Sequence, residues 1–298
     1  MSKQIENSSV LLAASNAAAG QVSVDSHFHI FKAAQSVAGA RYTPSYASSF
    51  KDWQSLAAAA GVTHGVLVQT SFMGADNRLL LAQLALHPHT LRGVAVVAPD
   101  TTMDALSALH AQGVRGIRLN LAGRSHDMAG WANASGLWDA LFELGWHVEL
   151  HTDAGYLADV LAALPLAIPL VVDHFAKPTE VSSRDGTVVA LRQRSHLGGK
   201  NDKKTGRSSG TGSVHIKLSA PYRLKPVKQA EQAKALTQLW LAELGPETLL
   251  WGSDWPCTNH EAQADYPELH NSLENWLVND DRLIALVRSE NPLRLYWS

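Results

Sequence analysis

Side chains that can bind a metal or activate water recur in this chain at the ends of short apolar runs. The first run, residues 22–29, includes His27 and His29, which are separated by one residue. Alternate side chains of a strand lie on the same face, so both imidazoles point the same way. Such a pair can hold a metal ion or a substrate anion, or the two histidines can simply be buried and packed.

Later apolar runs end with residues of the same kind, namely His151, His174 and Asp254. Each one alone could be a buried polar group with its hydrogen bonds satisfied. Histidines and an aspartate at matching positions are better explained if the strands carry them to one edge of a sheet. The set therefore predicts a functional site.

Eight apolar runs alternate with helical patterns along the chain. We expect strands over residues 22–29, 65–70, 92–97, 116–121, 146–151, 170–174, 214–219 and 248–254. We expect helices over residues 52–60, 77–86, 103–111, 137–144, 156–164, 188–196, 228–244, 269–277 and 281–288. Near-continuous apolar strands are typical of parallel sheets covered on both faces. The pattern predicts the α/β class and a single (β/α)8 TIM barrel, with its active site at the carboxyl ends of the strands.

Length and composition fit one large domain. The chain has 298 residues, of which 46% are hydrophobic and 17% charged, enough for a substantial core. We assign residues 1–21 to an N-terminal extension and residues 22–298 to the barrel. A stretch near 198–212 is rich in Gly, Ser and basic residues and predicts a mobile surface loop.

The charge and the cysteine content limit the partners and the cellular locations that we expect. The net charge of −2 does not favour a nucleic-acid partner. A single cysteine, Cys257, is typical of a reducing compartment. We find no apolar run of the roughly 20 residues needed to span a membrane, so we expect a soluble cytoplasmic protein.

The ordered motifs resemble the amidohydrolase superfamily (amidohydrolase 2 type), and within it the lactonase branch. That branch includes hydrolases of 2-pyrone-4,6-dicarboxylate and of sugar lactones. The matching stretches are residues 25–31, 41–44, 68–71, 74–77, 113–118, 172–174, 217–219, 251–256 and 291–297. They cover nearly the whole chain apart from the extension and the 198–212 loop.

The resemblance implies roles for the residues at the strand ends. Asp254 would be the general base that takes a proton from water and delivers it to the leaving oxygen. His27, His29 and His174 would polarise the lactone carbonyl by hydrogen bonds or through a metal ion.

The resemblance also implies one divalent metal held by His27, His29, His151 and Asp254. Nitrogen-rich ligation with an open position suits Zn²⁺, with Mn²⁺ as the second candidate. Members that open the pyrone dicarboxylate ring work without metal and carry tyrosine where this chain has His151. A metal-free site, in which His151 contacts the substrate, therefore stays open.

We expect an acidic or polyhydroxylated lactone as the small-molecule substrate. Arg118 and Arg223 are candidates to hold a carboxylate, because guanidinium binds it in a bidentate fork. Arg118 could instead form a structural salt bridge. Lys177 stands where the dicarboxylate lactonases have arginine, which leaves that exact substrate open. Further substrate-binding candidates are Tyr42, Gln69, Ser71, Arg124 and Lys177.

Three other readings compete with lactone hydrolysis. The same site could support metal-dependent decarboxylation, or isomerisation of one sugar lactone into another. A barrel that binds a ligand without turnover is the alternative outside enzymes.

Overall fold

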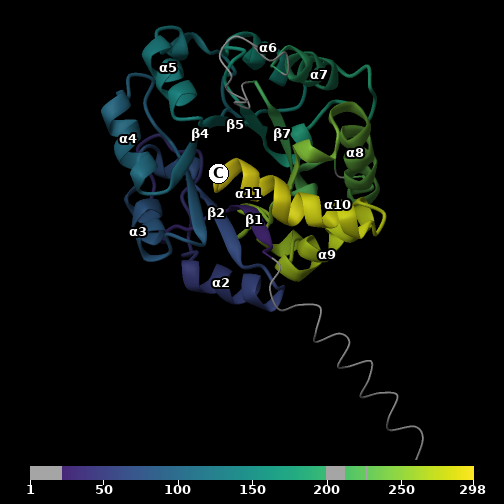
Figure 1. The fold of residues 1–298 in the computed structure, drawn as a ribbon. Coiled ribbons are helices and arrows are strands. Elements are labelled where there is room, and N and C mark those ends of the chain that lie inside the picture. The colour runs from purple at the N-terminus through teal and green to yellow at the C-terminus, as the bar shows by residue number, and fades with distance from the viewer. Residues whose placement is uncertain (1–21, 199–211, 226) are drawn as a thin grey trace, which may run out of the picture.

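The computed structural model describes residues 22–198, 212–225 and 227–298. The predicted N-terminal extension and most of the predicted loop near 198–212 lie outside the described residues. Eight parallel strands form one sheet in the order β1 to β8, and helices surround it (Figure 1). The predicted (β/α)8 barrel is confirmed.

Strands and helices alternate along the described chain. The strands are β1 (Val24–Phe28), β2 (His64–Val68), β3 (Leu91–Ala95), β4 (Val114–Asn120), β5 (His147–His151), β6 (Leu170–Val172), β7 (Val214–Leu218) and β8 (Leu249–Trp251). The helices between them are α2 (Phe50–Ala59), α3 (Arg78–Leu86), α4 (Met103–Ala111), α5 (Ser135–Glu143), α6 (Leu157–Ala162), α7 (Gly186–Gly198) and α8 (Gln229–Leu244). After β8 come α9 (Tyr266–Trp276), α10 (Asp281–Ala285) and α11 (Asn291–Tyr296).

The barrel closes between its first and last strands just beyond β8. Phe28 forms a parallel bridge with Trp255. The backbone N–H of Asp254 donates to His27 O at 2.8 Å, and that of His29 donates to Trp255 O at 2.8 Å. Closure therefore joins the segment that carries the two histidines directly to the segment that carries Asp254.

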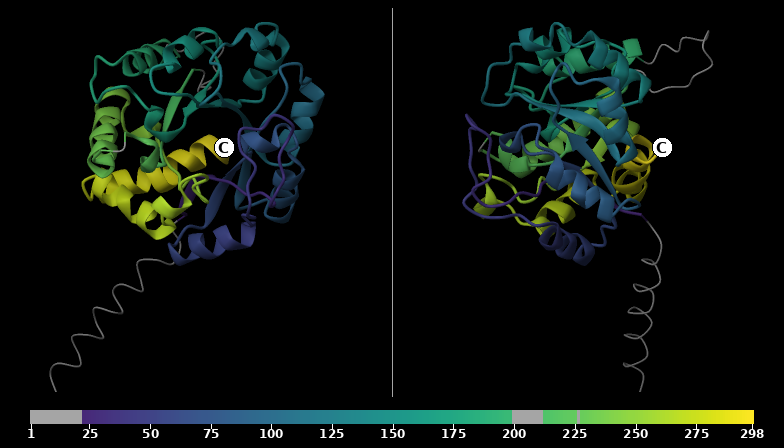
Figure 2. Two further views of the ribbon diagram at one scale, coloured as in Figure 1. Left: turned by 180° about the vertical axis from the view of Figure 1, so that it is seen from behind. Right: turned by 90° about the vertical axis from the view of Figure 1, so that its left-hand side faces the viewer.

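Helix α11 closes the amino-terminal end of the barrel. Its Tyr296 is fully buried and packs with Val24, Val66, Val94 and other apolar residues from the strands. The helix crosses the middle of the ring in Figure 1, and the view from behind in Figure 2 shows the opposite end. This third C-terminal helix was not expected from the sequence.

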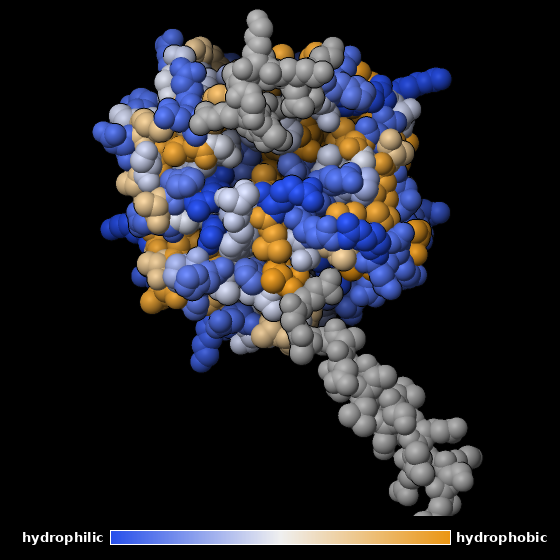
Figure 3. Space-filling view, viewed as in Figure 1, coloured by the Kyte–Doolittle hydropathy of each residue, from blue (hydrophilic) through white to orange (hydrophobic). Residues whose placement is uncertain are grey.

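Polar and apolar residues are interspersed on the α11 side of the molecule (Figure 3). None of the described helices combines the length and the apolar character needed to cross a membrane.

Several predicted strands end earlier than expected, and two of these ends concern predicted site residues. The sixth strand stops at Val172 and the eighth at Trp251, whereas we predicted ends at His174 and Asp254. Both of these residues have positive φ, 55° for His174 and 57° for Asp254. A left-handed residue cannot continue a strand, so the chain turns at these points and carries both side chains to the barrel edge.

Candidate active site

The first two histidines and the aspartate meet where the barrel closes. His27 lies in β1, His29 follows that strand, and Asp254 follows β8. His27 Nε2 and His29 Nε2 are 3.1 Å apart, and each lies 3.4 Å from Asp254 Oδ1. All three side chains are buried. Residues far apart in the sequence thus form one compact triangle.

The other oxygen of Asp254 is held by the turn after β7. The Tyr222 hydroxyl donates to Asp254 Oδ2 at 2.8 Å, and Arg223 Nε donates to the same oxygen at 3.1 Å. Burial raises the pKa of the Asp254 carboxyl, but Arg223, His174 and His29 outweigh burial and hold this pKa well below its usual range. Asp254 is therefore ionised at neutral pH. Sequence reasoning missed Tyr222, and its only signal was its place beside Arg223.

The orientation of His29 is set by a backbone carbonyl. His29 Nδ1 lies 2.7 Å from Val68 O at the end of β2. A carbonyl oxygen can only accept, so His29 carries a proton on Nδ1. The other ring nitrogen, Nε2, then faces His27 and Asp254.

His174 lies on an unusual left-handed turn. His174, Phe175, Ala176 and Lys177 have φ values of 55°, 58°, 57° and 40°. Each such non-glycine residue costs roughly 1–2 kcal/mol, so tertiary contacts must hold the turn. Phe175 is fully buried, and the indole N–H of Trp240 donates to its carbonyl at 3.0 Å.

The imidazole of His174 is neutral and faces Ser219. Burial is the largest effect on it and lowers its pKa to about 3. His174 Nδ1 lies 2.9 Å from Ser219 Oγ at the end of β7. If this hydroxyl donates to Nδ1, the Nε2–H of His174 is free to donate to a ligand.

His151, at the end of β5, is paired with a cation. Lys177 Nζ lies 3.0 Å from His151 Nε2. Burial, followed by His174, lowers the pKa of His151 well below its usual range, so the ring is neutral and can accept from the ammonium. Burial also lowers the pKa of Lys177, to about 8. The structure thus places a lysine against a ring nitrogen of the histidine that the resemblance assigns to a metal.

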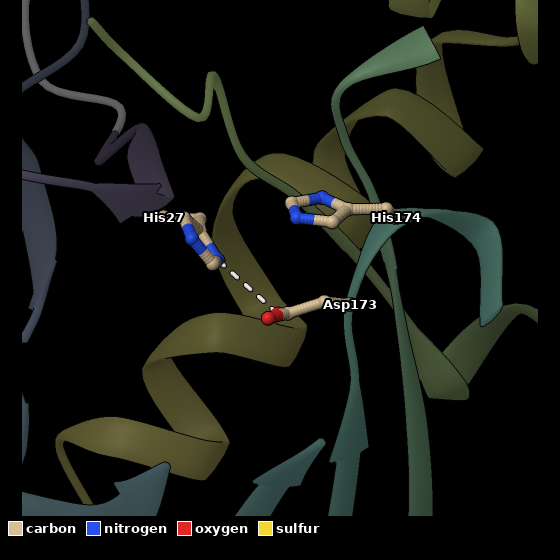
Figure 4. A group of neighbouring side chains, drawn as sticks. All are labelled: His27, Asp173 and His174. Atoms are coloured by element: carbon tan, nitrogen blue, oxygen red, sulfur yellow. Dashed lines mark ion pairs between the residues drawn. The ribbon is translucent and has the colours of Figure 1, made fainter. Parts of the chain in front are cut away.

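Charged side chains of neighbouring strands lie beneath the histidines, inside the barrel. His27 Nδ1 is 3.2 Å from Asp173 Oδ1 (Figure 4). Arg118 donates to Asp173 Oδ2 at 2.9 Å, and Lys217 Nζ lies 2.5 Å from Glu149 Oε2. The predicted alternative of a salt bridge for Arg118 is thus present, although Arg118 also reaches the cavity above.

A cavity of about 200 Å³ opens at the carboxyl ends of the strands. His29, His151, His174 and Asp254 contribute to its wall. The substrate-binding candidates that line it are Tyr42, Ser71, Arg118, Arg124 and Arg223. Arg41 also lines the cavity, and sequence reasoning had not singled it out although it precedes Tyr42 in a quoted motif.

Three predicted site residues are not among the described residues that line this cavity. His27 is fully buried beside His29. Lys177 touches His151, as described above. The side-chain amide of Gln69 donates to Gly74 O at 3.2 Å and Asp76 O at 2.9 Å, so it supports the loop that carries Ser71.

The donor set at the barrel edge fits a divalent metal. Ligand atoms of His27, His29 and Asp254 all lie within 4.8 Å of one another. Imidazole nitrogens and the ionised carboxylate of Asp254 are suited to a cation. His151, the predicted fourth ligand, is outside this group, and its Nε2 lies against Lys177.

A parallel eight-stranded barrel with histidines and an aspartate at its carboxyl edge defines an amidohydrolase-type enzyme. The sequence profile of the amidohydrolase family matches residues 24–297. The chain belongs to this family.

Relatives of known activity are similar over most of their length. The chain is 28% identical over 280 residues to a 2-pyrone-4,6-dicarboxylate hydrolase of Comamonas testosteroni, covering 92% of this chain and 90% of the relative. It is 28% identical over 291 residues to a 4-sulfomuconolactone hydrolase of Hydrogenophaga intermedia, covering 91% of this chain and 88% of the relative.

Two solved structures are similar to this chain in fold and in sequence over most of its length. A probable 2-pyrone-4,6-dicarboxylic acid hydrolase of Acinetobacter baumannii, with citric acid bound, is 28% identical and has a TM-score of 0.79, covering 93% of this chain and 99% of that one. A putative enzyme of the same name from Pseudomonas putida is 30% identical with a TM-score of 0.77, covering 93% and 98%.

Proposed function

We propose that this protein hydrolyses a lactone that carries an anionic substituent, with Asp254 as the general base. The observation that carries the proposal is an ionised carboxylate in the wall of a cavity lined by guanidinium groups. The Comamonas and Hydrogenophaga relatives, which are named for hydrolysis of a pyrone dicarboxylate and a sulfonated lactone, support it.

In the proposed reaction Asp254 Oδ1 takes a proton from water while the water oxygen attacks the lactone carbonyl carbon. The ring C–O bond then breaks, and Asp254 returns the proton to the leaving oxygen. One water is consumed and the ring opens to an acid. Tyr222 and Arg223 hold Oδ2 of the carboxylate, which leaves Oδ1 for this transfer.

His174 is the proposed donor to the carbonyl oxygen. It is neutral, it lines the cavity, and Ser219 lies against its Nδ1. A hydrogen bond from Nε2–H would stabilise the negative charge that develops on this oxygen. His29 Nδ1 is not available to the substrate, because it donates to Val68 O.

The guanidinium groups that line the cavity favour the binding of an anionic substrate. Arg118 and Arg223 are paired with Asp173 and Asp254. Arg41 also lines the cavity, and burial followed by the nearby Arg124 charge lowers the pKa of Arg41, as expected where like charges face one another. A substrate carboxylate or sulfonate between them would relieve this repulsion. Binding of citric acid by the Acinetobacter relative is consistent with an acidic ligand.

A divalent metal, with Zn²⁺ as the first candidate and Mn²⁺ as the second, would be held by His27, His29 and Asp254. When bound, such an ion lowers the pKa of water and polarises a carbonyl. We also propose a cytoplasmic location for the protein, because a single, buried cysteine suits a reducing compartment.

Purified protein should be tested with 2-pyrone-4,6-dicarboxylate and 4-sulfomuconolactone, and ring opening followed by absorbance and mass spectrometry. The product should gain the mass of water and release no carbon dioxide. Asp254→Asn should lower kcat by about 10²–10⁴-fold, the usual contribution of a general base. The matched control is Asp104→Asn, an exposed carboxylate of α4.

The outcomes separate the alternatives. Release of carbon dioxide would replace hydrolysis by decarboxylation, and a product of unchanged mass would indicate isomerisation. Full activity of Asp254→Asn would refute its role as base. Metal analysis with activity before and after chelation tests the metal: loss on chelation and recovery with Zn²⁺ support it, and unchanged activity refutes a metal requirement.

A further inference from the structure

Four consecutive residues at the barrel edge form one left-handed turn, which carries a site residue at each end. His174 begins the turn with a φ of 55°, and Lys177 ends it with a φ of 40°. His174 lines the cavity, and Lys177 lies against His151. Phe175 and Ala176, between them, have φ values of 58° and 57°. The positions of both site residues therefore depend on a backbone conformation that residues other than glycine avoid.

Contacts with two helices hold the turn in this conformation. The indole N–H of Trp240 in α8 donates to Phe175 O at 3.0 Å, and both side chains are fully buried. The Phe175 ring packs edge-on against Trp276 of α9, with 5.2 Å between the ring centroids. Of these two described tryptophans, only Trp240 is hydrogen-bonded to the backbone of the turn.

We propose that Trp240 is a positioning residue, which holds the left-handed turn and thereby places the His174 imidazole in the cavity wall. A buried carbonyl without a donor is unfavourable, so loss of the indole N–H favours rotation of the Phe175 peptide unit. Relief of the strained φ values favours the same rotation. Because His174 adjoins Phe175, such a rotation moves its imidazole away from the substrate. This role rests on the proposed function, in which His174 donates to the lactone carbonyl oxygen.

The first test removes the indole N–H by Trp240→Phe and measures kcat and KM under conditions in which every variant stays folded. A displacement of about 1 Å can cost about 10²-fold in rate, so we expect kcat to fall about 10–100-fold. KM should change little, because the hydrogen bond from His174 strengthens in the transition state. A wild-type kcat in Trp240→Phe would refute the role of Trp240.

Trp276→Phe is the matched control. It removes the same volume beside Phe175 but no hydrogen bond to the turn, so kcat should stay close to the wild-type value. An equal fall of kcat in both variants would show that packing positions His174, and would overturn the inference. If Trp240→Phe does not fold, Trp240 is replaced by 3-benzothienylalanine, which has the shape of tryptophan with sulfur in place of the N–H. The same fall of kcat is expected there.

A glycine in the turn provides a rescue that a merely structural role of Trp240 would not predict. Glycine adopts positive φ without the steric cost that alanine bears. When Ala176→Gly is added to Trp240→Phe, the turn depends less on Trp240, and kcat should return toward the wild-type value. Ala176→Gly alone should leave kcat unchanged. A double variant as slow as Trp240→Phe would refute strain in the turn as the cause of the loss.

Crystal structures of the variants show the turn without any lactone. In Trp240→Phe we expect the backbone of residues 174–177 to leave the left-handed region, and in the double variant to remain there. An unchanged turn in Trp240→Phe would overturn the inference. If the turn rearranges as expected but the wild type opens no lactone, the proposed function fails and the positioning of His174 by Trp240 stands.

Discussion

Removing the hydroxyl of Tyr222 should change the pH dependence of the reaction without removing any group that touches water or the lactone. The hydroxyl donates to Asp254 Oδ2 at 2.8 Å. Burial is the largest of the effects that raise the pKa of Tyr222 well above its usual value, so the phenol remains a donor at every working pH. In Tyr222→Phe the carboxylate loses one of the two donors to this oxygen.

The size of the effect follows from the charge on the acceptor. A hydrogen bond to an ionised group contributes about 1.5–3 kcal/mol. At 1.36 kcal/mol per pKa unit, its loss should move the acid limb of the kcat/KM profile upward by about 1–2 pH units. Near neutral pH Asp254 stays ionised, so the plateau should persist.

The assay is kcat/KM for lactone hydrolysis by the wild type and Tyr222→Phe, measured from pH 8 down to the lowest pH at which both stay folded, because the pKa of Asp254 lies well below its usual range. The matched control is Tyr266→Phe, because Tyr266 is also buried but donates to Asp25 at 3.2 Å instead. If both variants keep the wild-type acid limb, Asp254 is not the group whose ionisation controls catalysis. If both shift equally, the effect is not specific to the Tyr222 hydrogen bond.

Three further predictions address residues around the site. Lys177, whose pKa burial lowers to about 8, is charged below that pH and neutral above it, so KM for an anionic lactone should rise above about pH 8. Lys177→Arg should abolish this rise, and a rise that persists would show that another group titrates. Gln69→Leu leaves the carbonyls of Gly74 and Asp76 without their donor, so urea unfolding should show a loss of about 1–3 kcal/mol; an unchanged midpoint would contradict the supporting role. Burial raises the pKa of Cys257 to about 12, so iodoacetamide should label it only in the unfolded protein, and rapid labelling of the native protein would disprove its burial.

Much of the barrel could be predicted from local patterns. A buried parallel strand needs a short apolar run, and the helix after it needs an apolar stripe, so the eight runs and their alternation were visible in the sequence. The ends of the sixth and eighth strands were predicted too long. The apolar runs themselves end at Val172 and Trp251, and the predicted strands were extended into the polar residues that follow, where the chain turns because His174 and Asp254 take positive φ. Helix α11 was missed because six residues are too few to show a helical pattern. Its apolar side chains are explained only by their contact with the end of the barrel.

The sequence by itself determined the fold class and drew attention to the histidines and Asp254, since residue type and spacing are local properties. Only the tertiary structure decided what each of them faces. Lys217 meets His27 across 190 positions of the chain, and Tyr222 reaches Asp254 only because β7 and β8 are neighbours. The direction of a hydrogen bond, the tautomer of a histidine and the ionisation of a carboxylate depend on such through-space contacts. The positions at the barrel edge were therefore predictable, whereas their chemical states followed from the closed barrel.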